Sequence, residues 1–243
     1  MSRAQAPLAS VDRAYHLVGV AEEEFIGKRL RVEGERISFT RCDRIALILR
    51  TVDADVWQPQ TLELKKNDAA WFEREARLHE AIVARAMIQG TVVPVQPFTV
   101  FADSSALDIA TRSQYTRFRR SLNRIAGKAE WAVHIYKGPH RLPELSPYLL
   151  RTTLARPREE KGKTVRPHAE HVMQVWKACS ALATAARRIE ALFDPHQLFC
   201  GTFLVTQTRR DEFREALERL HPLAKELGLT YYLEGPRPAF NFI

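Results

Sequence analysis

Glu75 and His79 are the residues of this 243-residue sequence whose types and spacing come nearest to catalytic chemistry. Residues four apart share one face of a helix, and a carboxylate beside an imidazole can act as a general base. No nucleophile signature accompanies the pair, and His79-Glu80 cannot be extended to an H-E-x-x-H zinc motif. An enzyme would need further polar groups that converge on the pair. We therefore expect a structural role, with a buried imidazole held by its carboxylate neighbour.

The other candidates for chemistry are weaker. The run GKT at residues 162–164 resembles the end of a nucleotide-binding P-loop, but it lacks the preceding glycine and the preceding apolar strand. Cys42, Cys179 and Cys200 have neither disulfide-framework nor metal-ligand spacing, so we expect three reduced, mostly buried thiols. The sequence therefore predicts no enzyme, no cofactor and no metal.

Basic residues are the unusual feature of the composition, with a net charge of +8. Five arginines fall in one expected helix: Arg112, Arg117, Arg119, Arg120 and Arg124. On a helical wheel, Arg117, Arg120 and Arg124 lie opposite the apolar residues and should face water. Such a face can bind phosphates, but no stacking aromatics share it, so we interpret it as solvated surface. A nucleic-acid- or anion-binding adaptor is the alternative function, and docking of an acidic partner is a third interpretation.

The length of the chain allows one large domain or two small ones with real cores. No window approaches the roughly 20 apolar residues that a membrane-spanning helix needs. The N-terminal residues lack the apolar core of a secretory signal. We expect a cytoplasmic protein that is not associated with a membrane.

Apolar runs and a change of period predict a compact α+β domain over residues 1–102. The expected strands cover residues 15–20, 37–39, 45–49 and 91–101. Residues 53–67 are predicted to be a polar connection. Residues 68–89 have a helical period, with Asn67 as the expected N-cap. Pro94 and Pro97 suit a strand at a sheet edge.

A second α+β domain is predicted over residues 103–243, with an inserted helical portion. Its expected elements are a helix from Asp103 to near Gly127, a strand at 131–136, a polar stretch at 143–171, a helix at 172–192, a strand at 199–205, a helix at 211–227 and a strand at 229–233. The strand, helix and strand at the end are what half of a ferredoxin-like fold requires.

Six sequence segments appear in an order that carries a family resemblance. They are YHLVG at 15–19, WFEREARLHE at 71–80, VVPVQPFTVF at 92–101, LNRIAGKAEW at 122–131, YL at 148–149 and GPRPAFNF at 235–242. Over about residues 14–243 the sequence resembles the gas vesicle protein F/L family. Arg237 stands where that family has tryptophan, and Ala239 stands where it has a second proline.

The resemblance implies a two-domain α+β protein and a function without catalysis or cofactor. It implies a minor gas vesicle component that contacts the small hydrophobic shell protein, of the GvpA type, and helps it nucleate without aggregating. Other gas vesicle accessory proteins are further candidate partners, and nucleic acid is not expected. We expect Trp71 and Trp131, which mark two of the motifs, to be structural, like Glu75 and His79.

The C-terminal tail, residues 235–243, is the best candidate for a binding element. Its prolines favour an extended conformation, and its apolar end must be covered by something. It either packs on the protein's own domains or forms, with a groove, an apolar clamp for the shell protein. The residues predicted to bind are Gly235, Pro236, Arg237, Pro238, Phe240 and Phe242. If the clamp is correct, deleting the tail abolishes shell-protein binding and leaves the fold intact.

Overall fold

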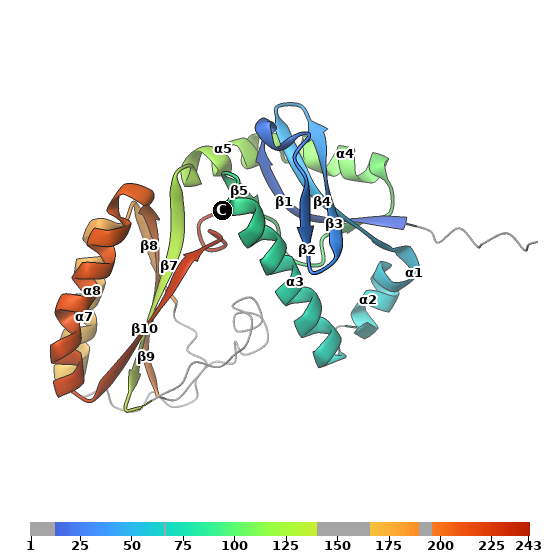
Figure 1. The fold of residues 1–243 in the computed structure, drawn as a ribbon. Coiled ribbons are helices and arrows are strands. Elements are labelled where there is room, and N and C mark those ends of the chain that lie inside the picture. Colours follow the sequence, from blue (N-terminus) through green and yellow to red (C-terminus); the bar gives the residue numbers. More distant parts are fainter. Residues whose placement is uncertain (1–12, 66, 140–165, 190–195) are drawn as a thin grey trace, which may run out of the picture.

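A computed structural model describes residues 13–65, 67–139, 166–189 and 196–243 of the chain. It contains two antiparallel sheets, each with its own helices (Figure 1). This mixed α+β architecture in two units confirms the predicted fold class. Tyr148 and Leu149, and most of the predicted insertion, lie outside the described residues.

The first sheet has the strand order β2-β3-β4-β1-β5, with β6 also paired to β1. Its strands are β1 (Arg13–Glu22), β2 (Leu30–Val32), β3 (Glu35–Cys42), β4 (Ile45–Asp53), β5 (Val92–Pro94) and β6 (Val100–Phe101). β4 forms next to β1 because its run IALIL is apolar on both faces. The segment that contains Pro94 lies at the sheet edge, as its prolines indicated.

Helices cover both faces of the first sheet. The helices of this unit are the 3₁₀ turn η1 (Glu23–Phe25), α1 (Ala54–Trp57), α2 (Pro59–Lys65), α3 (Ala69–Met87), α4 (Ser104–Ser113) and α5 (Tyr115–Ile125). α3 packs on one face through Leu78, Ile82 and Val83. On the other face, Leu107 of α4 and Leu122 of α5 lie against the sheet. Each sheet face therefore has its own apolar core.

Three local predictions in this region were wrong. α1 and α2 occupy the expected polar connection. The N-cap of α3 is Asp68, whose carboxylate accepts a hydrogen bond from the Trp71 amide, one residue after the predicted cap. The single helix expected after Asp103 is broken at Gln114, where φ is −105° and ψ is 4°. Separately, both α4 and α5 pack on the first sheet. The predicted domain boundary after residue 102 stays a prediction.

The second sheet has the order β10-β7-β9-β8, and every neighbouring pair is antiparallel. Its elements are β7 (Lys128–Lys137), α7 (Arg166–Leu182), β8 (Ala185–Arg188), β9 (Gln197–Thr206), the 3₁₀ turn η2 (Gln207–Arg209), α8 (Arg210–Glu226) and β10 (Leu229–Arg237). This succession and order make up the complete ferredoxin-like unit of which the sequence indicated half. α7 and α8 lie side by side on one face of the sheet (Figure 1).

β8 corrects the predicted helix over residues 172–192. The helix ends at Leu182, and Ala185 to Arg188 pair with β9 as an edge strand. Alanine and arginine favour helices by themselves, so the ladder with β9 decides the conformation of this segment.

Candidate functional site

The tail leaves the second sheet and packs between the two units of the fold. Pairing between β10 and β7 is irregular from Glu234 to Arg237, and the backbone there crosses the Trp131 indole. Gly235 has φ of 141°, and a Cβ at this position would lie 2.8 Å from the Trp131 ring. Only glycine fits such a close approach at this φ. The tail motif and the strand entry that contains Trp131 are thus parts of one structural element.

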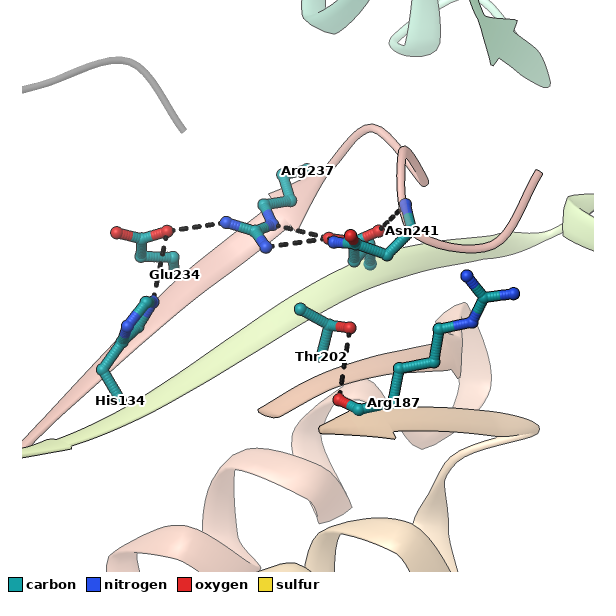
Figure 2. Close-up of polar contacts among 7 residues, drawn as sticks. His134, Arg187, Thr202, Glu234, Arg237 and Asn241 are labelled. Carbon is teal, nitrogen blue, oxygen red and sulfur yellow. Dashed lines mark hydrogen bonds and ion pairs between the residues drawn. The ribbon is translucent and has the colours of Figure 1, made fainter. Parts of the chain in front are cut away.

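A buried carboxylate holds the tail in place. Glu130 on β7 is 1% exposed, and Arg237 donates two hydrogen bonds to its Oε1, from Nε at 3.0 Å and from Nη2 at 2.8 Å. Asn241 donates from its backbone amide at 2.9 Å and from its side-chain amide at 2.6 Å (Figure 2). A buried charge is tolerated when it is paired and hydrogen-bonded in this way.

The ion pairs continue along the sheet beyond Arg237. Its Nη1 donates to Glu234 at 2.8 Å, and His134 Nε2 lies 3.7 Å from the same carboxylate (Figure 2). Burial acts to lower the pKa of His134, but hydrogen bonding and charge from Cys200 and Glu234 outweigh it and raise that pKa to about 9. Carboxylates and cations therefore alternate from Glu130 to His134.

The apolar end of the tail fills the space between the units. Phe242 is fully buried in the core cluster that contains Leu122 from the first unit and Leu204 from the second. Phe240 is only partly buried, and its ring centroid lies 6.3 Å from that of His79. The protein's own domains thus cover Phe242 completely and Phe240 in part. Its predicted role in binding a partner stays a prediction.

A groove that we call the edge groove lies next to the last residues of the tail. Its volume is about 610 Å³, and it lies between the β5–β6 edge of the first sheet and the helices α4 and α5. Phe240 and Ile243 of the tail line it, together with Pro94, Val95 and Pro97 from the sheet edge. Among the described residues that line it, Arg117 is the one with a charged side chain. A groove with both polar and apolar lining beside a sheet edge suits an extended polypeptide.

A second groove, which we call the inter-sheet groove, lies next to the first part of the tail. Its volume is about 780 Å³. It is lined by the end of α3, the turn from α5 to β7, the end of β9, the start of α8 and the tail residues Pro236, Pro238 and Ala239. The charged residues that line it are Lys128 and Arg210.

Glu75 and His79 do not form the pair that the sequence suggested. The Glu75 carboxylate accepts hydrogen bonds from Arg50 at 2.5 Å and from Arg74 at 3.2 Å. His79 Nδ1 instead lies 3.3 Å from Nε2 of His16, and both imidazoles are buried. Desolvation lowers the pKa of His79 to about 3, and the same cause holds the pKa of His16 well below 6.5. The expectation of burial is confirmed, but the expected partner of His79 is wrong.

The arginines of α4 and α5 divide into two groups. Arg117, Arg120 and Arg124 are exposed, as the helical wheel predicted. Arg112 is paired with Asp108 and Asp43, and Arg119 is paired with Glu22. Ion pairs on the protein itself thus reduce the positive charge of this surface.

Three further features of the described residues concern the cysteines, metal ligands and membrane-spanning helices. All three cysteines are buried and unbridged. Within the described ranges, no three histidine, cysteine, aspartate or glutamate side chains converge as metal ligands would. None of the helices that the structure describes is both long and apolar enough to cross a bilayer.

Sequence reasoning missed Glu130 and Asn241, the two residues that fasten the tail. The signal for Glu130 in the sequence was its position as a lone glutamate before the apolar run WAVHIY, in a strand with no other acidic residue. Such a residue, if buried, requires a cation. The tail arginine at the position of the family's tryptophan was the matching signal.

Comparisons with known proteins agree with this architecture. The family described as "Gas vesicle synthesis protein GvpL/GvpF" matches residues 15–243. Gas vesicle protein L of Streptomyces sp. (strain CB03234) is 23% identical over 232 residues, which cover 87% of this chain and 84% of that protein.

Two crystal structures have a similar fold. Gas vesicle protein GvpF from Anabaena sp. PCC7120 superposes with a TM-score of 0.66 at 14% identity and covers 95% of both chains. GvpF from Microcystis aeruginosa gives 0.65 at 12% identity, over 94% of this chain and 98% of that one. At these identities the likeness shows the fold, and the match along the sequence shows the family. The chain belongs to the GvpL/GvpF family of gas vesicle synthesis proteins.

Proposed function

We propose that this family member binds the gas vesicle shell protein in the edge groove and delivers it to the growing vesicle. The observation that carries the proposal is a groove along the edge of the first sheet, with the apolar side chains of Phe240 and Ile243 of the tail in its wall. The mechanism is capture, and no bond is made or broken. The proposal places the protein in the cytoplasm, at the gas vesicle.

The hydrophobic effect supplies the reason for capture. The small, apolar shell protein that the family resemblance implies would aggregate in water. A groove that covers part of its apolar surface lowers the free energy of the monomer and leaves it able to transfer to the assembly. Backbone groups at an edge strand can hydrogen-bond to an added strand, while the groove beside the edge receives alternate side chains of that strand. β5 supplies the edge, and Val95 with Phe240 supplies the apolar surface.

Filling the groove tests the proposal. Ala110 lines the edge groove from α4, so Ala110→Arg places a long charged side chain in it without breaking the helix. The neighbouring Ile109 is 68% exposed and does not line the groove. Ile109→Arg is therefore the matched control. Tagged variants co-expressed with the shell protein are purified, and the bound shell protein is measured.

We expect Ala110→Arg to lose most of the shell protein and Ile109→Arg to retain it. Equal recovery with both variants, or no shell protein bound to the unaltered chain, contradicts the proposal. The rival adaptor function predicts a mobility shift with nucleic acid that weakens steeply as salt rises, because phosphate contacts release counterions.

Deletion of the tail is a poor test of binding, because the tail is part of the core. Removing residues 235–243 exposes the surface that Phe242 covers and leaves Glu130 without its cation. The truncated chain would lose stability together with any binding. Substitutions in the groove separate the two effects.

A further inference from the structure

We infer that the inter-sheet groove is a docking surface for an acidic, amphipathic segment of a different partner polypeptide. This groove shares no lining residue with the edge groove, and different tail residues line the two grooves. The inference is therefore independent of shell-protein binding. It concerns a second interaction surface on the same molecule.

Apolar side chains supply one half of the complementarity. Ile88, at the end of α3, lines the groove and is 73% exposed, which ties it with Leu64 as the most exposed large apolar side chain among those described. Met87 from the same helix end and Trp131 from β7 also line the cavity. A cavity of about 780 Å³ with an isoleucine open to water at its wall can bury the apolar side chains of a bound segment.

The charge of the groove supplies the other half of the complementarity and indicates an acidic partner. The charged residues that line the groove, Lys128 and Arg210, are both basic. Lys128 donates to the carbonyl oxygens of Arg124 and Ala126, which do not neutralise its charge. Arg210 makes one exposed ion pair, with Asp211 at 3.3 Å, and such pairs contribute little in water. Carboxylates on the partner would pair with these two cations, close to the exposed apolar side chain of Ile88.

The net charge of the chain makes a second copy of this protein an unfavourable occupant of the inter-sheet groove. Its net charge is +8, so two copies repel each other, whereas an acidic chain is attracted. Phe242 of its own tail is buried in the core and cannot insert into a neighbour's groove. An acidic partner other than this protein fits both observations.

A random-peptide phage library, selected on the unaltered protein, is the probe. We expect the enriched peptides to combine apolar residues with aspartate or glutamate. Their binding is then measured by fluorescence anisotropy against the double variant Ile88→Glu/Arg210→Glu. The matched control is Ile109→Glu/Arg219→Glu, which makes the same chemical changes at exposed sites outside the groove. Arg219 lies nine residues from Arg210, on the opposite side of α8.

The groove variant should bind the enriched peptides at least about tenfold more weakly, and the control should bind them within about twofold of the unaltered protein. The charge-dependent part of the binding should fall as salt rises. The inference is overturned if no peptides are enriched, if they lack acidic residues, or if both variants bind alike. Ile88→Glu/Arg210→Glu leaves the edge groove unchanged, so this variant should still co-purify with the shell protein. That measurement distinguishes a failure of this inference from a failure of the proposed function.

Discussion

At the scale of single residues, the buried carboxylate of Glu130 is the group on which the tail depends. Arg237 and Asn241 together direct four hydrogen bonds to it. The net contribution of such a pair to stability is small when it is intact, because both charges had to leave water. The loss of one partner is costly, because the other charge stays buried alone.

Arg237→Ala should lower the free energy of unfolding by about 3 to 5 kcal/mol, since it leaves Glu130 without its cation. Urea denaturation measures the change. Arg219→Ala is the control, because its ion pair is exposed and should change stability by less than about 1 kcal/mol. Similar losses in both variants would show that the buried pair has no special role.

The two buried imidazoles give the first unit a dependence on pH. The folded state lowers the pKa of His79 to about 3 and also lowers that of His16, so both are neutral when the protein is folded. The unfolded chain binds protons at these residues below pH 6.5, and the folded chain does not. The stability that they contribute is therefore complete above pH 6.5 and is lost as pH falls toward 3.

Lowering the pH from 7 to 5 should cost about 2 kcal/mol of stability through His79 alone. Urea denaturation at the two pH values measures the loss. His79→Leu removes the titrating group, so its stability should fall less between pH 7 and pH 5 than that of the unaltered chain. A pH dependence that His79→Leu leaves unchanged would contradict this assignment.

At the scale of elements, the start of α3 illustrates how a cap is chosen. Asn67 and Asp68 are both good N-cap residues by type. In the structure the Asp68 carboxylate accepts the Trp71 amide hydrogen bond, whereas the Asn67 side chain reaches back to the carbonyl of Glu63. The choice between them depends on where α2 ends.

Asp68→Ala should lower stability by about 1 kcal/mol, because the first turn of α3 loses the acceptor for its amide. Asn67→Ala should cost less, since it removes only a long, exposed hydrogen bond of 3.4 Å. Thermal unfolding of the two variants measures the difference. The reverse order would show that the cap lies where the sequence placed it.

At the scale of the whole molecule, the tail links the two units. One core cluster contains Leu17 of β1, Leu122 of α5, Leu204 of β9 and Phe242 of the tail. The first sheet, its helices and the second sheet therefore share one apolar core beneath the tail. The edge groove and the inter-sheet groove both take their shape from this arrangement, because tail residues form a wall of each.

Ending the chain after Arg237 should uncouple the units. The unaltered protein should unfold in one cooperative transition, whereas the truncated chain should show a lower melting temperature and two separable transitions. The physical reason is the loss of Phe242, a fully buried side chain of the kind whose removal costs about 3 to 5 kcal/mol. Differential scanning calorimetry shows the number of transitions. One unshifted transition in the truncated chain would mean that the tail does not link the units.

Local sequence patterns predicted most of the elements, because burial and hydrogen bonding impose a period that one segment can display by itself. The helix around Trp71, the strand around Trp131 and the final helix and strand all form close to where their periods placed them. The ordered motifs also identified the family. Neither inference required knowledge of which segments touch.

The sequence by itself determined the class of fold and the family, and the tertiary structure decided the partners of the polar residues. Glu75 pairs with Arg50, 25 residues away, and Glu130 pairs with Arg237, 107 residues away. β8 forms a strand because β9 lies beside it, against its own helical propensity. These pairings depend on which side chains come within a few ångströms of each other when distant segments pack. The periodicity of one segment contains no information about its distance from another segment.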